Sequence, residues 1–186
     1  MEYKELLASV EAILFASGEA VPIDRICEAV EADYSTVEKV IRNLNDVYEN
    51  NYSALTVLKL GNKYQMSTAS KYADVIRKAL EIRRNQPLSQ AAFEVLAIVA
   101  YKQPVTKAYI DQTRGVDCTG VISGLCEKGL IEEAGRLDLP GRPLQYVTTE
   151  NFLRCFSLSS LDDLEPIPIP EGIEEHQTQE VENTQE

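Results

Sequence analysis

Apolar residues in the first quarter of the chain recur at helical spacing in three segments. Residues 2–16 carry one apolar stripe, with alanines at every fourth position on a second face. A short helix is expected to contain Pro22 in its first turn and to direct Ile26 inward. Residues 35–38, with the sequence Ser-Thr-Val-Glu, match a capping box, which predicts a third helix that continues to about Tyr48.

Alternating apolar and polar residues follow these three helices. Residues 55–60 and 64–68 flank the sequence Gly-Asn-Lys at 61–63, a pattern that predicts a β-hairpin. A further helix is expected at about 71–82. The helical pattern ends before Pro87, because proline disfavours helix at the residue that precedes it.

The second half of the chain shows the same order of elements. Ser89 can cap the helix that opens this half, and Gly129 is placed to end its third helix. Two strands around the turn at Pro140-Gly141 follow. The expected elements are helices at 90–101, up to Gly115 and at 119–128, strands at 130–133 and 144–148, and a last helical turn capped by Thr149.

The two halves are related by an offset of 84 residues without a gap. Apolar positions that this offset aligns are Ala16 with Ala100, Val21 with Val105, Ile26 with Ile110, Val37 with Val121 and Ile41 with Leu125. Three helices followed by a hairpin form a winged helix. We therefore predict an α+β, mainly α fold with tandem winged-helix domains, at residues 1–86 and 87–160, followed by a tail at 161–186.

Charge is distributed unevenly along the chain. The net charge of the 186 residues is −12, and residues 161–186 hold nine acidic side chains and no Lys or Arg. The remaining residues hold 21 acidic and 18 basic groups, a balance of −3. Residues 161–172 (LDDLEPIPIPEG) are expected to be extended, and the acidic end disordered. No segment is long and apolar enough for a membrane span or resembles a signal peptide, so we expect a cytoplasmic protein.

No set of residues in the sequence suits catalysis. The four cysteines Cys27, Cys118, Cys126 and Cys155 form no CxxC pair, so we expect reduced, buried core thiols. The single histidine, His176, lies in the acidic tail. Residues 115–120 have the glycine spacing of a phosphate loop but lack the Lys and Ser/Thr that must follow it. We therefore predict neither an enzyme nor a metal or cofactor site.

Winged helices often bind DNA through the third helix, which presents polar and basic side chains to the bases. The helix at 119–128 offers only Thr119, Ser123 and Lys128, which indicates a packing helix. The equivalent helix of the first half holds Lys39, Arg42, Asn43 and Asn45, together with acidic residues. A basic cluster could contact the DNA backbone or form a solvated helix face: Arg77, Lys78, Arg83 and Arg84.

Two helices carry more apolar surface than one small domain covers. The helix at 90–101 is apolar on every side, so the first domain or a partner protein must cover part of it. Its candidate anchors, each of which could instead belong to the core, are Phe93, Leu96 and Tyr101, with Leu139 on the wing. On the first helix, a candidate surface for a second copy of the chain is formed by Leu7, Ala8, Glu11, Ala12 and Phe15.

Several segments resemble the segregation and condensation protein B family. The segments are ASVEAILFASGEAVPIDRI, LSQAAFEVLAIVAYKQPVTKAYIDQTRGVD, GRLDLPGRPLQYVTT and NFLRCFSLSSLDDL. Together the resemblance covers residues 10–164, and the YKQPVTKAYIDQTRGVD and PGRPLQYVTT motifs are specific to that family. The chain departs from the family at Ser157, where glycine is expected, and at Glu165, where proline is expected.

The resemblance implies a non-catalytic subunit of a condensin-like complex in chromosome condensation and segregation. Such a subunit forms a homodimer through its first domain and holds the kleisin subunit, ScpA, on an SMC ATPase. It would act in the cytoplasm at the nucleoid, with DNA bound only weakly or indirectly. From the apolar helix at 90–101, and not from the resemblance, we expect the kleisin to bind around Phe93, Leu96, Tyr101 and Leu139. A winged-helix DNA-binding transcriptional regulator is the alternative function.

Overall fold

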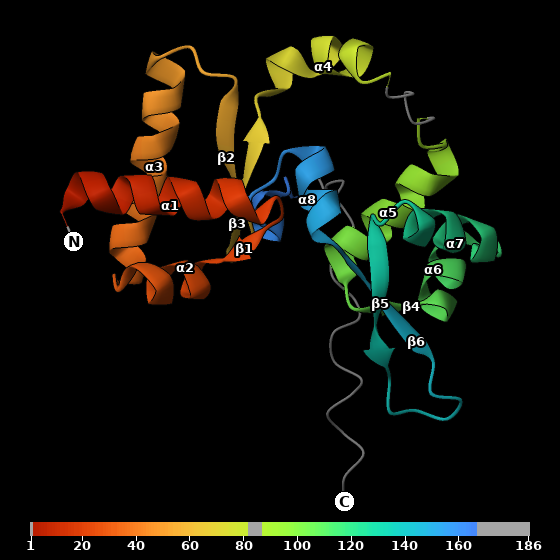
Figure 1. Ribbon diagram of the computed structural model, residues 1–186. Helices are drawn as coiled ribbons and strands as arrows, with labels where there is room; N and C mark the ends of the chain where they lie inside the picture. The colour runs from red at the N-terminus through yellow and green to blue at the C-terminus, as the bar shows by residue number, and fades with distance from the viewer. Residues whose placement is uncertain (1, 82–86, 167–186) are drawn as a thin grey trace, which may run out of the picture.

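The computed structural model describes residues 2–81 and 87–166, which form two similar groups of elements (Figure 1). The first group comprises α1 (Tyr3–Ser17), β1 (Val21–Pro22), α2 (Ile23–Val30), α3 (Tyr34–Asn50), β2 (Leu55–Leu60), β3 (Lys63–Thr68), the 3-10 turn η1 (Ser70–Tyr72) and α4 (Ala73–Ala79). The second comprises α5 (Gln90–Lys102), β4 (Val105–Thr106), α6 (Lys107–Arg114), α7 (Thr119–Glu127), β5 (Ile131–Arg136), β6 (Leu144–Thr148), α8 (Glu150–Phe156) and the 3-10 turn η2 (Leu161–Asp163).

Each group is a winged helix with the same sheet topology. The strand order is β1-β3-β2 in the first sheet and β4-β6-β5 in the second, with antiparallel pairing throughout. Val21 pairs with Tyr64 and Val105 pairs with Tyr146. The 84-residue offset therefore relates strands as well as helices: β1 maps onto β4 and α2 onto α6. The predicted tandem winged-helix fold is confirmed.

Each copy has its own apolar core. The first is built from α1, α2, α3 and the wing, and Val10, Ile26 and Val37 in it have no exposed surface. The second is centred on α5, where Val95 and Val99 are fully buried. The apolar stripe predicted on residues 2–16 therefore faces the first core, whereas α5, predicted to be apolar on every side, is buried along one side only.

The copies meet where the first wing contacts α8, which lies between them in Figure 1. Leu60 of β2 is buried in the core of the second copy. The Gly61 amide donates to the Ser159 carbonyl at 2.7 Å. The Arg154 guanidinium donates to the Gln65 side chain at 2.8 Å. These contacts join residues that are about 90–100 positions apart, and no local pattern in the sequence indicated them.

Local details differ from the predictions at several helix starts. Asp33, not Ser35, caps α3: its carboxylate accepts from the Thr36 amide at 2.9 Å. Hydrogen bonds from the Ser35 and Thr36 hydroxyls, and from that amide, lower the pKa of Asp33 to about 2. Pro22 does not lie in the first turn of α2 as expected but is its N-cap residue and ends β1, because Val21 and Pro22 both pair with β3 of the wing.

Three further predictions are corrected. The helix expected at 71–82 is divided into η1 and the short α4. Residues Leu161–Asp163, predicted to be extended, form a 3-10 turn, because Ser160 and Asp163 make a capping box. Cys155 is exposed rather than buried, and Cys27 and Cys126 are half-buried; only Cys118 is a core thiol.

No helix in the described part of the chain is long and apolar enough to cross a membrane.

Candidate protein-binding surfaces

One face of α5 remains exposed although the helix is apolar all round. Val95, Val99 and their neighbours fill the core, while Phe93 and Tyr101 stay 45% and 38% exposed. Ala97 is exposed between them. Spaced four residues apart, these three side chains share one helix face, which we call the α5 stripe. Leu96 is only 2% exposed and belongs to the core, which is the alternative that the sequence left open for each of these anchors.

The first copy and the C-terminal segment add side chains to the core around α5. Ala20, Leu58 and Leu60 of the first copy pack on the core of the second, and so do Leu161 and Leu164. The first copy therefore covers this core only in part, and the α5 stripe stays open.

Leu139, the predicted kleisin contact on the wing of the second copy, does not lie near the α5 stripe. Leu139 is 54% exposed in the loop between β5 and β6, where its carbonyl accepts from the Arg142 amide at 2.8 Å. This loop lies away from α5 in Figure 1. A single partner helix on the α5 stripe would therefore leave Leu139 uncovered, so the structure does not bring the four predicted kleisin contacts together.

On α1, three of the five predicted dimer residues form an exposed face. Ala8 and Ala12 are exposed, and Phe15 is 72% exposed. Leu7 is half-buried and packs against the core of the first copy. The Glu11 carboxylate accepts from the Tyr48 hydroxyl at 2.6 Å and thereby ties α1 to α3.

The predicted basic cluster is described only in part. Arg77 pairs with Asp74 one helical turn away, and Lys78 is exposed. Arg83 and Arg84 lie outside the described residues, as does His176.

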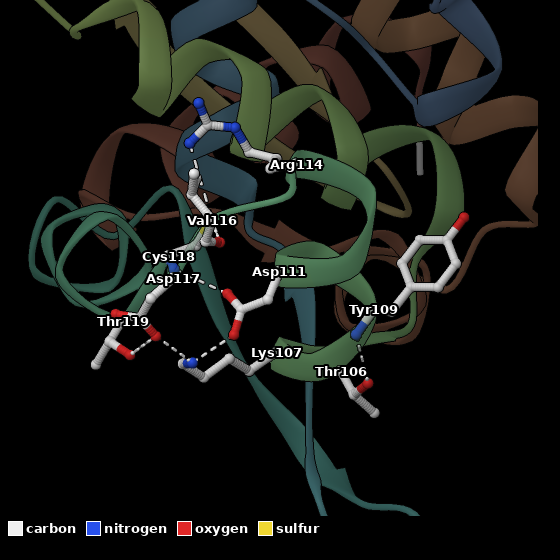
Figure 2. A network of polar contacts seen from close by, with 9 residues as sticks. All are labelled: Thr106, Lys107, Tyr109, Asp111, Arg114, Val116, Asp117, Cys118 and Thr119. Atoms are coloured by element: carbon white, nitrogen blue, oxygen red, sulfur yellow. Dashed lines mark hydrogen bonds and ion pairs between the residues drawn. The ribbon is translucent and has the colours of Figure 1, made fainter.

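A polar network stabilises the turn between α6 and α7 (Figure 2). Lys107 lies between Asp111 and Asp117 and pairs with both. Hydrogen bonds with these two carboxylates raise the pKa of Lys107 and lower the pKa of Asp111 and Asp117. The Cys118 amide donates to Asp111 at 2.8 Å. Each charge faces an opposite charge or a hydrogen-bond donor, so the network serves to orient α7.

Arg114 links the same turn to α5. Its guanidinium pairs with Glu94 at 2.6 Å and donates to the Cys118 sulfur at 3.7 Å. Hydrogen bonds from Gln90 and Arg114 lower the pKa of Glu94. Arg114 and Glu94 lie 20 positions apart, and the sequence analysis missed their pairing. Both residues stand in the LSQAAFEVLAIVAYKQPVTKAYIDQTRGVD segment that carries the family resemblance.

The polar residues of the third helices, α3 and α7, are only partly available to a ligand, and on α3 Lys39 and Arg42 are exposed. On α7 the exposed polar residues include Thr119, Ser123 and Lys128, as the sequence predicted. On α3, two residues considered for base contacts are bound within the protein. Asn45 donates to the Val57 carbonyl at 2.9 Å and accepts from the Val57 amide at 2.7 Å. Asn43 donates to the Tyr3 hydroxyl at 2.7 Å.

The end of α5 is held by a residue whose role the sequence did not reveal. The Gln103 side-chain carbonyl accepts from the Thr148 amide at 2.5 Å and from its hydroxyl at 3.0 Å. This contact joins the YKQP and YVTT motifs.

Within residues 2–81 and 87–166, no group of three or more His, Cys, Asp or Glu residues could hold a metal ion.

Comparison with known proteins supplies the family. The family model for segregation and condensation complex subunit ScpB matches residues 8–167. Segregation and condensation protein B of Ruminiclostridium cellulolyticum is 44% identical over 164 residues, which cover 88% of this chain and 86% of the relative. The protein of the same name from Lachnoclostridium phytofermentans is 40% identical over 185 residues, covering 100% of this chain and 97% of the relative. Among solved structures, ScpB from Mycobacterium tuberculosis is 30% identical, with a TM-score of 0.42; the match covers 85% of this chain and 98% of that one.

Proposed function

The chain belongs to the ScpB family of segregation and condensation complex subunits, and we propose that it is a non-catalytic subunit that binds the kleisin ScpA as a homodimer. Through the kleisin it would join an SMC ATPase and act in chromosome condensation and segregation, in the cytoplasm at the nucleoid. ATP would be bound by the ATPase and not by this chain, for which we propose no cofactor.

The exposed α5 stripe is the observation that supports kleisin binding most directly. Phe93 and Tyr101 are large aromatic side chains that the chain leaves 45% and 38% exposed on a helix whose opposite side fills the second core. Exposed aromatic residues near the centre of an apolar patch contribute most to many protein interfaces. We propose that an apolar helix face of the kleisin packs against this stripe.

The alternative function, a DNA-binding regulator, has less support. Asn43 and Asn45 are occupied by intramolecular hydrogen bonds, and α7 exposes few cationic groups. Phosphate neutralisation by clustered Lys and Arg supplies most of the affinity for DNA. In our proposal Arg77 and Lys78 contribute at most a weak backbone contact.

Substitution of the α5 stripe tests the proposal. Phe93→Asp should weaken binding of the purified kleisin by about 30-fold, since loss of a central aromatic anchor typically costs about 2 kcal/mol. Tyr34→Asp is the matched control, because Tyr34 is an aromatic residue with 46% exposure on α3 of the first copy. Affinity is measured by calorimetric titration after circular dichroism has shown that both variants fold.

The kleisin affinities of these two variants distinguish the α5 stripe from other candidate binding surfaces. Loss of affinity in Phe93→Asp alone supports the α5 stripe as the kleisin site. Equal affinity of the folded Phe93→Asp variant and the wild type contradicts it, and the first wing (residues 55–68) is then the next surface to test. Complete absence of kleisin binding by the wild-type chain contradicts the proposed function itself.

A further inference from the structure

The α5 stripe is an apolar face beside the second core that the described residues leave partly exposed. Phe93, Ala97 and Tyr101 are all exposed on it, while Val95 and Val99 on the opposite side are fully buried. Exposed apolar side chains that lie together on one helix face usually mark a surface to which another segment or protein binds. The last described residues indicate that this segment belongs to the C-terminal part of the same chain.

The C-terminal segment reaches the α5 stripe at Tyr101. Leu161 lines a groove together with Gln103, the residue after the end of α5. Four residues later, the Glu165 carbonyl accepts from the Tyr101 hydroxyl at 2.7 Å. The chain therefore passes from the groove that Gln103 lines to Tyr101, and a continuation in the same direction would lead toward Ala97 and Phe93. The description of the structure ends at residue 166, one residue after this contact.

The residues that follow match the stripe in length and chemistry. Residues 166–170 read Pro-Ile-Pro-Ile-Pro. Alternate prolines favour the polyproline II conformation, which rises about 3.1 Å per residue, so four residues beyond Glu165 span about 12 Å. Phe93 and Tyr101 lie eight residues apart on α5, which is also about 12 Å. Ile169 would thus lie level with Phe93.

The chemistry of the two surfaces is complementary as well. Proline-rich segments dock on aromatic side chains, because their stiff backbone loses little entropy on binding. The two isoleucines, Ile167 and Ile169, continue the apolar series of Leu161 and Leu164, both of which already pack on the second core. The strongly acidic part of the tail begins only at Glu171, beyond the end of the stripe.

We propose that residues 167–170 of the same chain lie along the α5 stripe and cover Phe93 and Ala97. Since the kleisin is proposed to use the same stripe, this segment would compete with it and lower its affinity. That second consequence rests on the proposed function, whereas the docking itself does not.

Tryptophan fluorescence tests the docking without any partner. The chain contains no tryptophan, so each introduced one is the only such fluorophore. In the full chain, the Ile169→Trp variant should show a quenching constant for acrylamide about threefold lower than the Ile173→Trp variant, since a short tether gives an effective concentration in the millimolar range. Ile173 is a matched control, an isoleucine of the same tail beyond the stripe.

Two second-site changes show whether the protection arises on α5. Phe93→Ser, or Ala97→Glu if the first variant does not fold, should raise quenching in Ile169→Trp to the level of the Ile173→Trp control. Equal quenching of the two tryptophan variants in the wild-type background overturns the proposal. So does protection that persists in the folded α5 variants, or that disappears on dilution, because the latter indicates a second copy as the occupant.

Kleisin titration then separates the docking from the proposed function. A chain that ends at Pro166 should bind the kleisin about fivefold or more tightly than a chain that ends at Gly172, which retains the segment. Equal affinities overturn the competition. If neither chain binds the kleisin while the Ile169→Trp variant is protected, the docking is supported and the proposed function fails.

Discussion

Glu31 and Gly115 occupy the same position in the two copies, and both take a left-handed backbone conformation after a short helix. The φ angle is 52° at Glu31 and 71° at Gly115. The left-handed region costs a side-chain-bearing residue about 1–2 kcal/mol, because its Cβ approaches the carbonyl oxygen. Ser157, where the family resemblance predicts glycine, has a φ of 57° at the end of α8. Serine therefore replaces the expected glycine at a position where a residue with a side chain has backbone strain.

Glu31→Gly should therefore stabilise the protein by about 0.5–1 kcal/mol, once the greater backbone entropy of glycine in the unfolded chain is included. Gly115→Ala is the reciprocal control and should destabilise by about 1 kcal/mol. A Cβ at Gly115 would meet no atom within 4 Å, so that cost is conformational and not steric. Urea midpoints followed by circular dichroism measure both. A lower midpoint for Glu31→Gly would contradict the argument.

Asn45 shows how one side chain connects a helix to a strand. It makes two hydrogen bonds to the backbone of Val57, at 2.7 and 2.9 Å, so that α3 is fixed against β2 at the start of the wing. The bonds form between residues 12 positions apart, and the side chain is only partly exposed. In the sequence the same residue suited a base contact, because an amide side chain on a third helix fits both roles.

Asn45→Ala should destabilise the protein by about 1–3 kcal/mol, since it leaves the Val57 amide and carbonyl without their partner. Asn43→Ala is the control on the same helix: it removes one exposed hydrogen bond to Tyr3 and should cost about 0.5 kcal/mol. Thermal melting of the two variants compares the effects. Equal losses would show that the Asn45 contact to β2 contributes no more than a surface hydrogen bond.

For the molecule as a whole, α1 offers a surface for a second copy. Ala8 and Ala12 let another backbone approach closely, and Phe15 is 72% exposed beside them. A self-complementary two-fold contact is the commonest oligomer geometry. We expect a mass of twice 20.8 kDa by light scattering.

Phe15→Asp or Ala8→Asp should convert this dimer to a monomer, because each places a charge in an apolar contact without a partner. Val75→Asp is the control, a residue with 66% exposure on α4, and should leave the mass unchanged. The expectation is wrong if the wild-type chain has a monomeric mass at tens of micromolar.

The distribution of charge predicts weak DNA binding by the whole chain. With a balance of −3 outside residues 161–186 and nine further acidic groups within them, few phosphates can be neutralised. We expect a dissociation constant of about 10⁻⁴–10⁻⁶ M at physiological salt, independent of sequence. Fluorescence anisotropy with two unrelated duplexes measures this, and truncation after Pro166 should tighten binding to both equally. Nanomolar, selective binding would instead favour the regulator.

The sequence alone determined the duplication and the order of the elements. Helix and strand periodicity is a local property, and each copy folds around its own core, so Val10 and Ile26 could be assigned to the interior from their spacing. The residue that caps a helix is harder to predict, because the cap depends on one side chain. Ser89 and Thr149 cap α5 and α8 as predicted, whereas α3 is capped by Asp33 and not by the predicted Ser35.

Only the tertiary structure decided which apolar residues are available to a partner. Phe93 and Leu96 are alike in sequence context, three positions apart on one apolar helix, yet one is 45% and the other 2% exposed. The difference arises because residues remote in sequence, such as Leu60 and Leu164, pack on the same core. Hydropathy records the tendency of a side chain to leave water, but the surface that covers it depends on how distant segments meet.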